Sequence, residues 1–86
     1  MKASHILVHT LEEVQSILAE VNTLNFASLA QTHSKCPSKA RGGDLGEFGP
    51  GQMVKPFEDA TLATPIGEIS QPVQTQFGYH LIHRTG

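Results

Sequence analysis

An α+β fold is predicted for this sequence of 86 residues by three observations. The first residues, Ala3–Val8, are strand-like, two segments with helical spacing of apolar residues follow, and two further strand-like segments close the chain. Between these parts lie a glycine-rich loop, a short strand and a third helix. The order β-α-α-β-α-β-β indicates an α+β domain. A chain of this length is expected to form a single domain, residues 1–86, with one modest core.

The first strand, Ala3–Val8, has apolar side chains on both faces, which indicates a central strand covered on two sides. Thr10 and Glu13 then form a capping box, in which the hydroxyl accepts from the amide of the glutamate. Apolar residues recur at helical spacing over residues 11–21, so the first helix is expected to end at residues 22–24.

A second helix is expected to begin after Asn25, because an Asn side chain suits the N-cap position. Spacing predicts that this helix buries one face. That face would consist of Phe26, Leu29, Ala30 and, at its end, His33.

The second half of the chain contains the remaining four elements. A short strand is expected at Leu45–Phe48, and Pro56 suits the first turn of a third helix, where its missing N–H costs little. The buried face of this helix would consist of Phe57, Ala60 and Thr61. Two strands, Ile69–Thr75 and Tyr79–Arg84, then form an antiparallel hairpin. Pro72 belongs at a sheet edge or at a break in the hydrogen bonding.

Composition excludes several classes of function. The formal charge of −2 gives no long-range attraction for nucleic acid. The apolar content of 38% is that of a soluble globular protein, and no apolar run approaches the ~20 residues that span a bilayer. A single cysteine and the lack of a visible secretory signal favour a reducing compartment. We therefore expect a cytoplasmic monomer that binds neither nucleic acid nor membrane.

A long loop, Ser34–Phe57, carries the only cysteine and five of the eight glycines. Loops of this length are usually functional or disordered. Its spaced large apolar residues argue against disorder, so the loop is expected to form one wall of a binding site. These side chains are Leu45, Phe48, Met53 and Phe57. The alternative is that they are ordinary core residues, as large apolar residues usually are.

The histidines do not form a local metal site. His5 and His9 lie about 13 Å apart if both are on one strand, and His80 and His83 point to opposite faces of another. His5 and His80 each lie among aliphatic residues, where a neutral His–His hydrogen bond would satisfy part of their polar requirement. They are either satisfied core histidines or part of a site. A metal or thiol site built from His5, His80 and Cys36 through the fold stays open.

Cys36 has Lys35, Lys39 and Arg41 close in sequence, and cationic neighbours favour the reactive thiolate. A nucleophilic cysteine with His5 as its base is one interpretation. The other is a small buried hydrophobe, which is the commoner role of a lone cysteine.

The sequence resembles the parvulins, a family of small peptidyl-prolyl cis–trans isomerases. The resemblance covers nearly the whole chain, in family order, which makes it far more specific than any single motif. The matching blocks are Ser4–Val8, Ser34–Cys36, Gly43–Phe48, Gly51–Ala60, Gly67–Val73 and Thr75–Ile82. It implies a four-stranded antiparallel sheet surrounded by helices.

The resemblance also implies roles for eight residues. His5 and His80 match the paired active-site histidines, Cys36 matches a position held by cysteine or aspartate, and Thr75 matches the hydroxyl that joins the histidine network. The residues that match the groove gripping the proline ring are Leu45, Met53, Phe57 and Phe77.

The implied reaction is rotation about an Xaa-Pro peptide bond, the rotamase activity of a folding catalyst. No covalent bond is broken, so no metal, cofactor or nucleophile is expected, and Cys36 is expected to act by electrostatics and hydrogen bonding. The implied partners are proline-containing peptides and unfolded or folding proteins. The main alternative is a non-enzymatic module that holds proline-containing segments or acts as a chaperone.

The resemblance further bears on specificity. Parvulins that require phosphate before proline carry a basic cluster in a long loop after the first strand. Here that connection is only His9-Thr10, and Glu12 and Glu13 follow. A phosphate dianion needs Arg or Lys. We therefore expect phosphate-independent activity that tolerates or favours apolar residues before proline, with a mild acidic preference open through Lys39 and Arg41.

Overall fold

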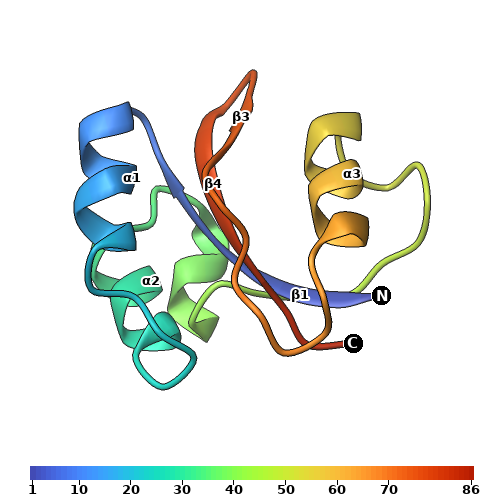
Figure 1. Ribbon diagram of the computed structural model, residues 1–86, viewed down its shortest axis with the longest axis horizontal. Helices are drawn as coiled ribbons and strands as arrows, with labels where there is room; N and C mark the ends of the chain where they lie inside the picture. The colour runs from blue at the N-terminus through green and yellow to red at the C-terminus, as the bar shows by residue number, and fades with distance from the viewer.

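A computed structural model describes all residues from 1 to 86 and shows a sheet between two helical layers (Figure 1). The sheet is antiparallel, with the strand order β2-β1-β4-β3. Its strands are β1 (Lys2–Val8), β2 (Asp44–Glu47), β3 (Val73–Thr75) and β4 (Gly78–Arg84). The helices are α1 (Leu11–Leu18), α2 (Phe26–His33), the 3-10 helix η1 (Pro37–Arg41) and α3 (Lys55–Ala63). The α+β class is confirmed.

Strand β1 lies in the middle of the sheet and is covered on both faces, as its apolar residues predict. Helices α1 and α2 cover one face, and α3 covers the other (Figure 1). Ile6, Val8 and Leu81 pack toward α1 and α2, whereas Ala3 and Ile82 pack with Phe57 of α3. Side chains alternate between the faces of a strand, so His5 and Leu7 share the α3 side. The side chain of His5 therefore lies between the sheet and α3.

Arg84 fixes the position of α3 against the sheet. Its guanidinium Nη1 donates to the carbonyl oxygens of Thr61, Leu62 and Thr64, at distances of 3.2–3.4 Å. These carbonyls lie at the C-terminal end of the helix, where the carbonyl oxygens lack the usual i+4 partners. A cation at this end also interacts favourably with the helix dipole. Strand β4 thus holds the C-terminal end of α3.

Two features at the helix ends differ from the sequence prediction. The first helix ends at Leu18 rather than at residues 22–24, because the next turn tightens: both Glu20 and Val21 donate their N–H to Ile17 O. Val21 still packs on the core from this turn, which explains why the apolar spacing continues past the helix. Asn25 occupies the N-cap position but makes no capping bond. Its amide nitrogen instead donates to Glu20 O.

The end of α2 and the strand β3 also correct the prediction. His33 is exposed, not part of the buried face of α2. Regular pairing in β3 covers only Val73–Thr75, and Ile69 makes an isolated bridge to His83. Pro72 interrupts the ladder because it has no N–H, as its predicted edge position allows. None of the helices is long and apolar enough to cross a bilayer.

Candidate active site

Two histidines from the central strands face each other on the α3 side of the sheet. His5 lies opposite Ile82 and His80 lies opposite Leu7, so the two imidazoles are diagonal neighbours. Their Nδ1 atoms are 3.0 Å apart, and their ring planes differ by 17°. Both side chains are buried, with exposed fractions of 6% and 4%. The histidines therefore form a hydrogen-bonded pair within the core.

Burial keeps both imidazoles neutral at pH 7. Desolvation, and secondly the charge of His80, lowers the pKa of His5 from 6.5 to about 4. Desolvation likewise lowers the pKa of His80 to about 4. A neutral imidazole has one donor and one acceptor nitrogen, as an Nδ1–Nδ1 hydrogen bond requires.

Thr75 and Phe57 hold the pair in place. The Thr75 hydroxyl is 2.8 Å from His80 Nε2, and the same oxygen accepts the N–H of Phe77 at 3.2 Å. The ring of Phe57 meets both imidazoles edge-on, with centroid distances of 5.5 Å to His5 and 5.2 Å to His80. Strand β3 and helix α3 thus each contribute one contact that orients the histidines.

Counting donors and acceptors assigns the tautomers. If the Thr75 hydroxyl donates to His80 Nε2, then His80 Nδ1–H donates to His5 Nδ1, and His5 carries its proton on Nε2. The opposite arrangement would leave the Thr75 hydroxyl proton without an acceptor. The first arrangement therefore satisfies more groups. It leaves one buried donor, His5 Nε2–H, which has no partner in the protein.

The segment that carries Cys36 is attached to the end of β1. The buried Ser34 hydroxyl accepts the N–H of Leu7 at 3.0 Å and the N–H of Cys36 at 3.4 Å. Lys35 N–H donates to Leu7 O at 2.7 Å. These three bonds place the half-buried Cys36 beside the histidines, but no hydrogen bond joins its thiol to them.

Gly43 allows the loop to return close to His5. His5 N–H donates to Gly43 O at 2.9 Å. Gly43 has a φ of +83°, and a Cβ at this position would lie 2.2 Å from His5 O. A residue with a side chain would both strain the backbone and push β1 away. The glycine is therefore part of what positions the histidine.

Above the histidine pair the structure has a pocket of about 470 Å³ with mostly apolar walls. It includes seven of the eight residues that the resemblance assigned: His5, Cys36, Leu45, Met53, Phe57, Phe77 and His80. The eighth, Thr75, lies behind His80 and is bonded to it. The structure thus brings all eight together, and their roles in catalysis stay predictions.

Sequence reasoning missed five further residues that line the pocket. They are Leu7, Lys35, Pro37, Gln52 and Val54. Strand alternation from His5 was enough to place Leu7. The other four lie in the loop that was expected to form a wall of the site, but no sequence feature singles them out within it. Phe48, by contrast, lies in the core with Phe57 rather than in the pocket, in agreement with the interpretation of core packing for that residue.

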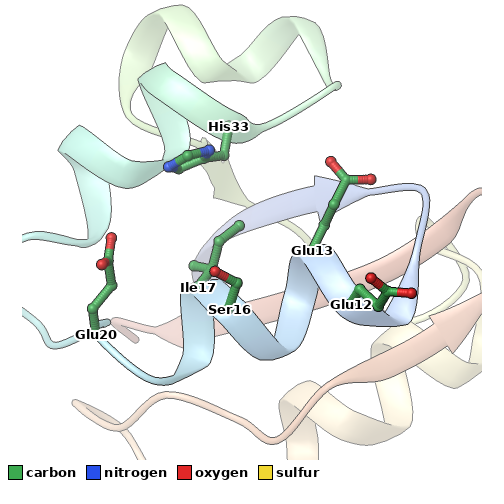
Figure 2. Close-up of a pocket in the computed structure, with 6 residues that line it drawn as sticks. All are labelled: Glu12, Glu13, Ser16, Ile17, Glu20 and His33. Carbon is green, nitrogen blue, oxygen red and sulfur yellow. The ribbon is translucent and has the colours of Figure 1, made fainter.

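A second depression, of about 450 Å³, lies between α1 and α2, on the opposite side of the sheet (Figure 2). Its lining is strongly acidic. Glu12 and Glu13 of α1 and Glu20, which follows this helix, line it together with His33 of α2. Nowhere do three or more potential metal ligands come together in the arrangement that a metal site needs.

The sheet order, the single helix over one face and the histidine pair beneath an apolar pocket define the parvulin class of protein. The family model described as "Rotamase: PPIC-type PPIASE domain" matches residues 5–86. The chain therefore belongs to the PPIC-type peptidyl-prolyl isomerase family.

Relatives of two kinds are similar to this chain. Peptidyl-prolyl cis-trans isomerase Pin1 of Digitalis lanata is 51% identical over 88% of this chain and 66% of its own length. Foldase protein PrsA 4 of Bacillus cereus is 46% identical over 99% of this chain and 31% of its own length. The chain thus spans about two thirds of the first relative and about a third of the second.

Solved structures show the same fold. The crystal structure of the PrsA peptidylprolyl isomerase from Bacillus anthracis superposes with a TM-score of 0.96, at 44% identity, over 100% of this chain and 41% of that one. The solution structure of NmPin, the parvulin of Nitrosopumilus maritimus, gives a TM-score of 0.81 at 40% identity, over 100% and 95% of the two chains. The predicted four-stranded parvulin fold is confirmed.

Proposed function

We propose that this chain accelerates cis–trans isomerisation of Xaa-Pro bonds in protein segments, and so assists folding. The observation that carries the proposal is the neutral histidine pair, held by Thr75, at the base of an apolar pocket. The family membership, and relatives named as isomerases and foldases, support it.

The pocket suits this reaction because the barrier comes from lost amide resonance, about 18–20 kcal/mol, and no bond has to be broken. A catalyst need only bind the twisted amide more tightly than the planar forms. A thousandfold acceleration requires about 4 kcal/mol of such preference. Leu45, Met53 and Phe57 would hold the proline ring and exclude water.

We infer that His5 Nε2–H donates to the rotating amide when bound substrate gains access to this buried nitrogen. It is a buried donor without a protein partner, and His5 lines the pocket. When the amide twists, its nitrogen lone pair is no longer delocalised into the carbonyl, so a fixed donor directed at that nitrogen stabilises the twisted form selectively. Thr75 and His80 keep the proton on His5 Nε2. Cys36 would add a weak dipole at the pocket wall.

Phosphate is not part of the proposed substrate. The connection between β1 and α1 is only His9-Thr10, and the acidic residues Glu12 and Glu13 follow. This connection therefore offers no Arg or Lys, which the binding of a phosphate dianion requires. Phosphorylating a serine before the target proline should therefore not cause a large increase in the rate. A large increase would contradict this part of the proposal.

Exchange NMR on an Ala-Pro or Leu-Pro peptide tests the proposed activity. We expect catalytic amounts of the protein to broaden or exchange the cis and trans signals. Binding shifts without faster exchange would instead support the alternative of a non-enzymatic module. His5→Ala and His80→Ala should reduce the exchange rate while the peptide still binds.

A cytoplasmic location and a monomeric state stay predictions. The single cysteine supports a reducing compartment. Fractionation of source cells tests the location, and light scattering against the chain mass of 9.3 kDa tests the oligomeric state.

A further inference from the structure

One lysine stands at the edge of an otherwise uncharged pocket. Lys35 is the only lining residue with a formal charge at pH 7, since the pKa values of His5 and His80 are about 4. No carboxylate is paired with it, because the one ion pair of the structure joins Lys55 to Asp59. A cation next to apolar walls interacts more strongly with an opposite charge than a cation in open solvent does.

The backbone of Lys35 is held firmly although its side chain is exposed. Its N–H donates to Leu7 O at 2.7 Å, and the neighbouring Ser34 hydroxyl accepts from Leu7 and Cys36. These bonds fix the backbone of Lys35 at the pocket wall, so its side chain stays attached at this point although the side chain itself is exposed. Lys39 and Arg41, which the sequence suggested as the source of an acidic preference, lie on η1 and do not line the pocket.

The acidic depression lies on the other side of the sheet from Lys35. Glu12, Glu13 and Glu20 line the depression between α1 and α2 (Figure 2), whereas Lys35 lies on the side of α3. The chain as a whole carries a charge of −2. The local charge at the candidate pocket is nevertheless positive because of Lys35. The pocket can therefore attract an anionic group although the whole chain is negatively charged.

We propose that Lys35 is a specificity-determining residue, which favours segments with an Asp or Glu next to the target proline. The inference rests on the proposed isomerase function. The apolar walls still accept uncharged neighbours, and Lys35 adds a preference for a carboxylate over the amide of the same shape. The contact is a direct ion pair at the pocket edge and requires no phosphate-binding cluster.

The test compares peptides that differ only in charge. Exchange NMR would give kcat/KM for Glu-Pro, Gln-Pro and Lys-Pro peptides, and for the matched series with the variable residue after proline. We expect Glu to exceed Gln by about threefold at about 10 mM salt in one of the two series, the effect of one exposed ion pair. The ratio should approach one at about 1 M salt. The series that shows the effect identifies the side on which Lys35 acts.

Three variants assign the preference to Lys35. Lys35→Gln should bring the Glu/Gln ratio close to one, and Lys35→Glu should reverse it in favour of the Lys peptide. Lys35→Arg keeps the charge and should keep the ratio. Lys39→Gln is the matched control, because it removes one positive charge from the same loop outside the pocket, and it should leave the ratio unchanged.

The outcomes separate this inference from the proposed function. A ratio near one in the unmodified protein, or a ratio that survives Lys35→Gln, overturns the role of Lys35 while isomerisation of the Gln-Pro peptide stands. If no peptide is isomerised, the proposed function fails, and the same peptides are compared by chemical-shift titration. Tighter binding of Glu than Gln that disappears in Lys35→Gln would still support Lys35, and equal binding would overturn it.

Discussion

The Nδ1 atoms of His5 and His80 lie 3.0 Å apart, although 75 positions separate the two residues in the sequence. The bond joins β1 to β4, the first and last strands of the chain, and Phe57 and Thr75 contact the pair from two further elements. The pair is therefore complete only when the whole sheet and α3 are in place. Stability and activity should respond together to changes at these contacts.

The folded protein should lose stability as the pH falls from about 6.5 to about 4. In this window the unfolded chain binds protons at both histidines, while the folded chain keeps His5 and His80 neutral. Lower pH stabilises the state that binds more protons, which here is the unfolded state. The free energy of unfolding therefore falls as the pH falls. A change from 6.5 to about 4 corresponds to roughly 3 kcal/mol for one histidine.

Urea unfolding between these pH values measures the effect. The double variant His5→Phe, His80→Phe should lose most of the pH dependence, whereas His9→Gln, at an exposed histidine, should keep it. A free energy of unfolding that stays constant across the window would show that the pair is not held neutral.

Replacing Thr75 by valine should affect both the histidine pair and the hairpin. The change keeps the shape but removes the oxygen that partners His80 Nε2 and Phe77 N–H. We expect a loss of roughly 1–3 kcal/mol in the free energy of unfolding, because groups are left without partners. We also expect kcat/KM to fall by about tenfold, which corresponds to ~1.4 kcal/mol.

Thr75→Ser keeps the hydroxyl and is the control. Nitrogen-15 spectra of the imidazoles should show one tautomer in the parent protein and in Thr75→Ser, and a mixture in Thr75→Val. Equal activity and identical spectra for the serine and valine variants would remove Thr75 from the site.

Gly43→Ala should be far more disruptive than Gly46→Ala. Both glycines have positive φ, at +83° and +69°, so an alanine is strained at either position. Only at Gly43 would the new Cβ meet another atom, His5 O at 2.2 Å, while nothing lies within 4 Å at Gly46. Each variant should lose about 1 kcal/mol from strain, and Gly43→Ala should lose activity as well because β1 must move. Matching losses of stability and kcat/KM in the two variants would contradict this account.

The sequence predicted most of the elements because each carries a local feature. The capping box of Thr10 and Glu13 forms as expected, and Pro56 lies in the first turn of α3. The errors come from hydrogen bonds of polar side chains, one local and one between segments distant in the sequence. Asn25 bonds to Glu20 O rather than capping α2, and Ser70 exchanges hydrogen bonds with Ile82 outside any regular strand. Such bonds depend on chain folding that spacing does not encode.

The candidate site was accessible from the sequence through the family resemblance rather than through any single residue. From spacing alone, His5 and His80 were as well explained by core packing as by catalysis, because nothing local reveals that two distant strands pair. The resemblance indicated Thr75 as a support of the pair, but it gave no role to Ser34. Ser34 is a serine among several, and only the fold shows that its hydroxyl ties Leu7 to Cys36.

Met53→Ala should weaken substrate binding more than it weakens the fold. Met53 is half-buried and lines the pocket, so truncation removes apolar contact with the proline ring. We expect KM for an Ala-Pro peptide to rise by about tenfold, the effect of losing ~1.4 kcal/mol. Met53→Leu preserves volume and should stay close to the parent protein. If KM is unchanged in Met53→Ala while the protein stays folded, the proline ring binds elsewhere.

Cys36→Ser should reduce activity only modestly. Isomerisation breaks no covalent bond, so a nucleophile has no step to perform. The thiol lines the pocket but makes no hydrogen bond to the histidines, so its contribution is limited to local polarity. We expect a loss of kcat/KM of at most about tenfold, or ~1.4 kcal/mol, in Cys36→Ser. Intact-mass spectrometry during turnover should show no substrate adduct, and thermal unfolding should check that the variant keeps its fold. A trapped adduct on Cys36, together with complete inactivation of the folded serine variant, would establish covalent catalysis and overturn the proposed mechanism.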